Sequence, residues 1–251
     1  MQCISFDIIT APDLASGCHL YGLKGLDPHA ISNAMFYKQR QQSGDEQLPL
    51  HLQRLVAVSL VVTEAGALSF IQLQNDDEGA LLAELFAILD SESCRLYWHS
   101  PQTLALLQLR ALSLGVVLPQ DWPLLKSEER RALQCGWFDV CQILQMDGGE
   151  NRLAEMASLL ALPANLGIAT GQCREIESDE QMHTLQQGCL VNALHLYLLY
   201  LRSALIQGVL LESEYHEMLI SVDGHLKNSD SPTLQHYSES FHSESGWVKL
   251  K

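Results

Sequence analysis

One stretch of the sequence joins two apolar, β-branched runs through a short turn, and it limits the fold more than any other segment. It reads RLVAVSLVVTEAGALSFIQL (residues 54–73), and its two runs flank Glu64, Ala65 and Gly66. Runs of this composition are typical of strands, and a short glycine-containing turn joins antiparallel strands in a hairpin. The chain is therefore expected to contain a sheet with at least one antiparallel pair.

Strand and helix patterns alternate around this hairpin. CISFDII (3–9) predicts a strand before it, and the polar stretch 27–47 between the two has a helical character. Apolar residues at helical spacing, with acids in the first turn, predict a helix over 76–89. CRLYWH (94–99) predicts a strand. The segment after it predicts a helix with Ser100 as N-cap and Pro101 at its first position, ending near Gly115.

The second half of the sequence is mainly helical in pattern. Pro163 to Asp179 lacks periodicity and is expected to be a loop. Helices are expected elsewhere, over 137–146, over 151–162, over 179–207 and from 211 to about Gly224, with one further short helix after Pro232. This order of elements predicts an α/β architecture, with helices packed on a central mixed sheet.

Size and composition fit a single globular domain with a packed core. The chain has 251 residues, of which 47% are hydrophobic. The sequence shows no internal repeat and no linker long enough to divide it. We expect one domain over 1–225 and a polar C-terminal segment over 226–251.

Charge and cysteine usage indicate a cytoplasmic protein. Seven cysteines occur without a CxxC pair, which is typical of reduced core residues. The apolar stretch 188–201 is shorter than the ~20 residues that cross a bilayer, so we expect no membrane span. The formal net charge of −15 works against non-specific attraction to nucleic acid or anionic lipid.

Four segments in the same order resemble the predicted 3′ to 5′ exonucleases related to the proofreading domain of DNA polymerase B, a branch of the DnaQ-like, RNase H-like superfamily. The resemblance covers nearly the whole chain. FDIITAPD (6–13) is similar to the family's FDIETxPD, and LALPANLGIATGQ (160–172) to its GLPGKxGxxGxxV loop. The other two segments are QLPLHLQRLVAVSLVV (47–62) and GCLVNALHLYLLYLRSALIQGVL (188–210). The resemblance implies an RNase H-like fold.

The resemblance also implies a chemistry based on carboxylates. Enzymes of this superfamily hydrolyse phosphodiesters with two divalent ions, which need several oxygen ligands. In the family these are an Asp and a Glu of the first strand, an Asp after the fourth strand and an Asp on the last long helix, with a tyrosine four residues before it. The corresponding positions here are Asp7, Ile9, Thr103, Asn192 and Gly188.

One carboxylate of four therefore remains, and the resemblance implies a degenerate exonuclease that holds metal at Asp7 at most, and weakly. No cofactor is expected. The alternative is an active, metal-dependent 3′ to 5′ exonuclease using Mg²⁺ or Mn²⁺ in a remodelled site built from Asp7, His99 and Asp139. His195, one helical turn after Asn192, is a further candidate for the cleft.

Structural roles account for the same residues. Asp139 is expected to cap or open its helix, His99 to end a strand, His195 to be hydrogen-bonded within a crowded helix, and Asp7 to cap a neighbouring turn. The functional hypotheses are accordingly binding ones. The partner is a single-stranded nucleic acid or another protein, a homodimer included. FYKQRQQ (36–42) is the short basic and aromatic stretch suited to contact a phosphate.

Overall fold

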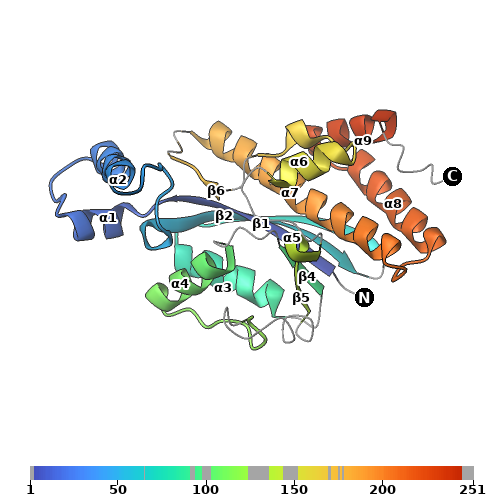
Figure 1. The fold of residues 1–251 in the computed structure, drawn as a ribbon, viewed down its shortest axis with the longest axis horizontal. Helices are drawn as coiled ribbons and strands as arrows, with labels where there is room; N and C mark the ends of the chain where they lie inside the picture. The colour runs from blue at the N-terminus through green and yellow to red at the C-terminus, as the bar shows by residue number, and fades with distance from the viewer. Residues whose placement is uncertain are drawn as a thin grey trace.

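The structure is a computed structural model that describes residues 3–64, 66–90, 94–97, 103–123, 136–143, 152–168, 171–174, 176 and 178–244. A mixed sheet forms its centre, and helices cover both faces of the sheet (Figure 1). The predicted α/β architecture is confirmed.

Five strands run across the sheet in the order β3-β2-β1-β4-β5, and β6 pairs with β1 beside that path. β2 is antiparallel to β1 and β3, whereas β4, β5 and β6 run parallel to their neighbours. Their bounds are β1 (Cys3–Pro12), β2 (Gln53–Glu64), β3 (Ala67–Gln74), β4 (Cys94–Tyr97), β5 (Trp137–Asp139) and β6 (Gly171–Gln172). The predicted hairpin is thus the β2–β3 pair.

Side chains of β1 alternate between two cores. Ile4, Phe6 and Ile8 pack with the helices on one face. On the other face, Asp7 contacts α7 (Asp179–Ile206), and Ile9 packs beside a cysteine of the same helix. Asp7 and Ile9 therefore share a face, as expected for residues two apart in a strand.

Two helices cover the face that Ile4, Phe6 and Ile8 occupy. They are α3 (Glu78–Leu89) and α4 (Thr103–Leu114), and their leucines pack into one cluster with Trp122 and Trp137. α3 begins where Asp77 accepts a hydrogen bond from the amide of Gly79 at 2.9 Å. A short polar side chain before an apolar period is a typical helix start.

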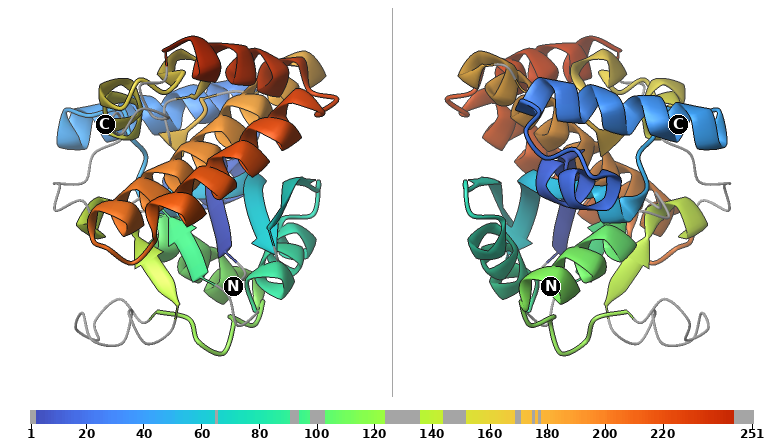
Figure 2. Two further views of the ribbon diagram at one scale, coloured as in Figure 1. Left: turned by 90° about the vertical axis from the view of Figure 1, so that its right-hand side faces the viewer. Right: turned by 90° about the vertical axis from the view of Figure 1, so that its left-hand side faces the viewer.

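The opposite face is covered by helices from the second half of the chain (Figure 2). They are α5 (Val140–Ile143), α6 (Arg152–Leu159), α7, α8 (Glu212–Lys227) and α9 (Pro232–Glu244). α7 lies against the sheet and is long and apolar enough to cross a membrane by length and composition. However, 78% of its most apolar window is buried inside the structure, as in the central helix of a globular core.

A small helical extension follows β1 at one end of the sheet (Figure 1). It consists of α1 (Leu14–Tyr21), α2 (Pro28–Ser43) and the short 3-10 turn η1 (Leu50–Leu52), packed around their own apolar cluster. Arg110 of α4 connects it to the main body. Its guanidinium contacts Asp13, the N-cap of α1, at 2.7 Å, and Glu78 at 2.6 Å.

Four boundaries differ from the sequence-based expectations. The helix expected over 137–146 opens with β5, because Trp137 to Asp139 pair with β4. The loop expected over 163–179 contains the 3-10 turn η2 (Ala164–Leu166) and β6. α1 was not expected, and α8 continues past Gly224 to Lys227. Short strands depend on their partners, which a local pattern does not contain.

α9 begins at Pro232, where a short helix was expected, and it buries Leu234, Tyr237 and Phe241 in the same core as α7. Apolar residues three or four apart place these side chains on one face of the helix. The division of the chain at residue 225 stays a prediction.

Candidate functional site

Asp7 belongs to β1, and its side chain faces α7. The sequence predicted Asp7 as the centre of the site. Nδ2 of Asn192 donates a hydrogen bond to its Oδ2 at 2.9 Å, and also donates to the carbonyl oxygen of Ile168 at 2.9 Å. Asp7 is 6% exposed and Asn192 3%. The sheet, the long helix and the segment before β6 therefore meet at one carboxylate.

Burial dominates the electrostatics of this carboxylate. Removal from water raises the pKa of Asp7 to about 6, although hydrogen bonds from Asn192, from the Ile8 backbone and from the Cys189 thiol act in the opposite direction. Desolvation penalises the charged form, whereas donors stabilise it. Burial likewise raises the pKa of Cys189, and the nearby Asp7 raises it further. The thiol is therefore held in its neutral form.

Ile9, the neighbour of Asp7 on the same face, lies in an apolar cluster. It is 1% exposed. The cluster also contains Ala11, Val56, Ala57, Met182 and Cys189, with Ile168, Cys173, Ile176 and Leu185 packed against it. Apolar side chains offer no oxygen to a cation, so this side of Asp7 provides packing and no ligand.

Two glycines allow the segment before β6 to pack on α7. A Cβ atom at Gly188 would overlap with Cγ2 of Ile168, and one at Gly167 would overlap with the side-chain oxygen of Asn192. At both glycines the neighbouring side chain already occupies the space that a Cβ atom would need. Ile168 consequently occupies the space beside Gly188.

β6 covers the edge of β1 at the same level. β4 pairs with residues 3–5 of β1, and beyond them Ile9 pairs with Gly171 and Thr10 with Gln172. The amide of Cys173 continues the ladder with a 2.7 Å hydrogen bond to the carbonyl oxygen of Thr10. Backbone of a later segment thus lies along the end of the strand that carries Asp7.

A family profile described as a predicted 3′-5′ exonuclease related to the exonuclease domain of PolB matches residues 45–241. The chain belongs to this family. The match includes the β2–β3 hairpin, α7 and most of α9, whereas β1 with Asp7 precedes the matched range. No curated protein and no solved structure matches the chain.

Ile9, Thr103, Gly188 and Asn192 are the other positions that the sequence resemblance aligns with the family's site. Of these, only Asn192 is in hydrogen-bond contact with Asp7 in the described part of the chain. Thr103 is the first residue of α4 and is 8% exposed. Its helix packs through Leu104 and Leu107 into the cluster that Ile4, Phe6 and Ile8 occupy. Gly188 contributes space for Ile168, as described above, and no functional group.

Asp139 ends β5, and its Oδ1 accepts a hydrogen bond from the amide of Cys141 at 3.0 Å. The expectation that it opens its helix is confirmed, because this bond lies at the start of α5. Asp139 pairs with Tyr97 across the sheet. Burial raises the pKa of Tyr97, and the charge of Asp139 raises it further. His99, expected beside it, lies outside the described residues.

His195 is buried one helical turn after Asn192, and the prediction that it is hydrogen-bonded is wrong. Within the described residues neither ring nitrogen has a hydrogen-bond partner. The imidazole packs against Tyr237 of α9, with 5.6 Å between ring centroids. Burial lowers the pKa of His195 to about 3, which keeps the ring neutral. His195 is therefore a core residue beneath α9.

The donor set around Asp7 does not fit two divalent cations. Such ions require several converging oxygen ligands, and Asp7 has an amide nitrogen and aliphatic groups beside it. No group of three His, Cys, Asp or Glu side chains in the described ranges is placed to bind a metal. Within the described residues, the surroundings of Asp7 therefore lack the several oxygen ligands that two such ions need.

Ile168 and Cys189 were missed by reasoning from sequence, although both lie at the centre of this arrangement. Cys189 follows Gly188 on α7 and contacts the Asp7 carboxyl, and Ile168 follows Gly167. The two glycines were the available signal, since a glycine inside a helix often marks a close approach. Which segment makes the approach is not contained in the local sequence.

Proposed function

We propose that the chain is a non-hydrolytic member of the PolB-related exonuclease family, in which the fold serves binding. The observation that supports this most is the hydrogen bond from Asn192 to Asp7. In place of a second carboxylate, the remaining acid faces an N–H group, which repels a cation at the position where a shared metal would lie.

Rotation of the Asn192 amide would not recreate a metal site. The amide nitrogen also donates to Ile168, and the side-chain oxygen lies against Gly167. A rotated amide would leave the partly buried carbonyl of Ile168 facing an oxygen in place of its donor, which costs about 1–3 kcal/mol. Even then, the negative charge of a single carboxylate would have to balance two divalent cations. The local packing thus favours the arrangement without metal.

The ligand that we propose for this fold is a single-stranded nucleic acid. We also propose that the protein is cytoplasmic. Replacing acids by Ile9, Thr103 and Asn192 removes repulsion toward phosphates. The net charge of −15 opposes contact over a large surface, so binding would have to be local and sensitive to salt. A small binding site agrees both with the loss of acidic side chains at these positions and with the negative net charge of the whole chain.

A protein partner is the second candidate, and one observation favours it. Large apolar side chains are exposed around the junction of α7 and α8, where Ile206 is 72% exposed, Val209 69% and Leu211 66%. Exposed apolar groups that gather in one place are typical of protein contacts. A homodimer is the simplest form, and light scattering coupled to size exclusion, on wild type and on Ile206→Ser, tests it.

The decisive experiment for the proposal is a nuclease assay with Mg²⁺ and with Mn²⁺ on single-stranded and duplex substrates. We expect no metal-dependent cleavage by the wild type. Asp7→Asn, purified in parallel, is the control for a contaminating nuclease. Cleavage that requires Mn²⁺ or Mg²⁺ and disappears in Asp7→Asn would overturn the proposal and support an exonuclease with a remodelled site.

A further inference from the structure

One face of α2 carries polar and aromatic side chains at helical spacing. Asn33, Phe36, Tyr37 and Arg40 follow one another at intervals of three, one and three residues, so they lie on adjacent turns. The whole helix, Pro28–Ser43, contains Lys38 and Arg40 and no acidic residue. In a chain with net charge −15, this is a locally basic element.

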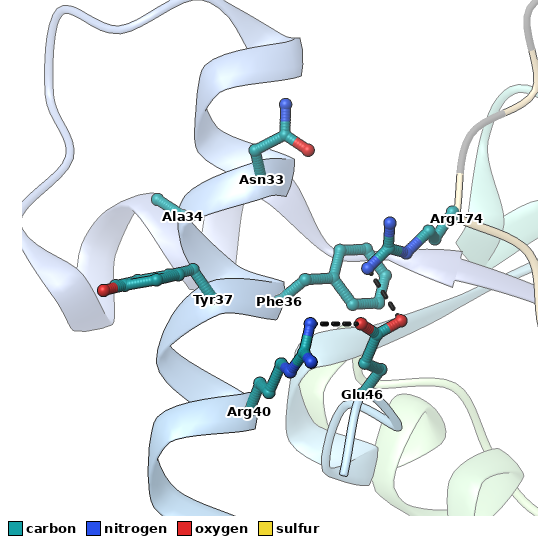
Figure 3. A pocket seen from close by; sticks show the side chains of 7 residues that line it. All are labelled: Asn33, Ala34, Phe36, Tyr37, Arg40, Glu46 and Arg174. Atoms are coloured by element: carbon teal, nitrogen blue, oxygen red, sulfur yellow. Dashed lines mark hydrogen bonds and ion pairs between the residues drawn. The ribbon is translucent and has the colours of Figure 1, made fainter. Parts of the chain in front are cut away.

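A second arginine reaches this face from a distant part of the chain. Arg174 follows β6, and its guanidinium lies over the ring of Phe36 at 4.6 Å from the centroid (Figure 3). Its Nη2 is 2.9 Å from Oε2 of Glu46, and Nη1 of Arg40 is 3.4 Å from Oε1 of the same carboxylate. Two guanidinium groups thus share one acid.

These side chains line a pocket of about 480 Å³, a volume in the range of small-ligand sites. Its lining is completed by Asn33, Ala34 and Tyr37. Tyr37 is 64% exposed, while the ring of Phe36 is buried. The pocket therefore combines an open aromatic ring, an amide and two cations that solvent reaches.

The charges favour an anion with several oxygens. Arg40, Arg174 and Glu46 sum to one positive charge, and all three side chains are more than half exposed. An exposed ion pair contributes little to stability, so a competing anion can displace the carboxylate at low cost. Guanidinium groups match phosphate geometry through paired N–H donors. The carboxylate of Glu46 lies between them as a phosphate would.

We propose that this pocket binds a nucleotide, with its phosphate between Arg40 and Arg174 and its base against Tyr37. The ligand is either a free nucleotide or one residue of a single strand, since both present the same phosphate and base. Tyr37 extends from α2 on the side away from Arg174 (Figure 3) and is 64% exposed. An exposed aromatic ring is a surface on which bases stack, and an acidic peptide would leave the ring unused. The choice of nucleic acid as one source rests on the proposed function, while the site is separate from Asp7.

Binding is measured by fluorescence anisotropy with a 5′-labelled oligothymidylate of twelve residues, and by calorimetry with adenosine 5′-monophosphate and with inorganic phosphate, at low and physiological salt. We expect saturable binding of at least one of the two nucleotide ligands. Arg40→Gln and Arg174→Gln should each weaken it about tenfold, the effect of one charge-assisted contact. For the oligonucleotide, each should also reduce the salt slope by about 0.7.

Two further variants separate a ligand site from a merely structural ion pair. Glu46→Gln removes the competing carboxylate and should tighten binding severalfold. Tyr37→Leu should weaken nucleotide binding about tenfold and leave the affinity for inorganic phosphate unchanged. Lys227→Gln, which removes an exposed cation paired with Asp223 on α8, is the matched control and should leave binding unaltered.

The two nucleotide ligands identify the source. Tighter binding of the oligonucleotide supports a strand, and equal or tighter binding of adenosine 5′-monophosphate supports a free nucleotide. Absence of binding by both at low salt, or an affinity that none of the four pocket variants changes, would overturn the proposal. Metal-dependent cleavage would contradict the proposed function alone, because it depends on Asp7 and the pocket variants leave Asp7 intact.

Discussion

The side-chain nitrogen of Asn192 donates to the carboxylate of Asp7 at 2.9 Å, across the interface between the central strand and the longest helix. The same nitrogen also donates a hydrogen bond to the carbonyl oxygen of Ile168. The carboxylate of Asp7 therefore connects β1, α7 and the segment before β6. A buried polar group that is hydrogen-bonded in this way contributes to the position of its neighbours.

The first prediction concerns the pH dependence that Asp7 creates. Its pKa is about 6 in the folded chain and about 3.9 in an unfolded one, so between these values the folded state binds more protons. The contribution of Asp7 to the free energy of unfolding then falls as pH rises from about 4 to 6, by up to about 3 kcal/mol. His195 contributes with the opposite sign in both the wild type and the variant, so the prediction concerns the difference between the two proteins. Asp7→Asn, which keeps the shape, lacks this loss. Urea denaturation at several pH values measures it.

The free energy of unfolding of Asp7→Asn minus that of the wild type should increase as pH rises from 4.5 to 7.5. The exposed Asp76→Asn controls for the removal of one negative charge. Curves of stability against pH that run parallel for wild type and Asp7→Asn would show that the carboxyl is not desolvated as described.

The second prediction uses the contact between Gly188 and Ile168. Gly188→Ala introduces a Cβ atom where Cγ2 of Ile168 lies, and should lower the free energy of unfolding by about 1–3 kcal/mol. Gly224→Ala is the control, because a Cβ there meets nothing within 4 Å; this helical position should gain about 0.5–1 kcal/mol. Chemical denaturation at neutral pH compares the two.

The same contact predicts coupling between its two partners. Ile168→Ala should cost less stability in the Gly188→Ala background than in the wild type, since it removes the overlapping atom. Additive effects of the two substitutions would contradict direct packing of Ile168 on the helix.

The third prediction concerns His195, whose pKa is about 3 because the ring is buried. An unfolded histidine has a pKa of about 6.5, so below that value the unfolded state binds more protons and stability falls with falling pH. From pH 7 to pH 5 the wild type should lose about 2 kcal/mol relative to His195→Leu. The opposite contribution of Asp7 is present in both proteins and cancels in this difference. A constant difference between pH 7 and pH 5 would place His195 in contact with water.

The fourth prediction tests the connection between the helical extension and the main body. Arg110 contacts Asp13 and Glu78, and all three side chains are less than a tenth exposed. Arg110→Ala leaves two buried carboxylates without their cation and should cost about 3–5 kcal/mol. Lys227→Ala removes the half-exposed lysine of a pair within one helix and should cost at most about 0.5 kcal/mol. A loss below 1 kcal/mol for Arg110→Ala would mean that solvent screens the cluster.

Periodicity was sufficient for elements that carry their own signal. The β2–β3 hairpin, α3 and α7 lie where alternation, caps and helical spacing predicted them. β5 and β6 were missed because they have three and two residues, and only pairing with β4 and β1 makes them strands. A short strand has no period of its own.

For the candidate site, the sequence by itself determined the side chains: a single acid at Asp7, an isoleucine at Ile9, an asparagine at Asn192 and no side chain at Gly188. Tertiary structure decided what these side chains do. Packing brought Asn192 to Asp7, placed Ile168 beside Gly188 and buried His195 without a hydrogen-bond partner among the described residues. It also carried Arg174 to Phe36. The physical reason is that ligands and donors are fixed by residue type, whereas desolvation and contact depend on which distant segments pack together.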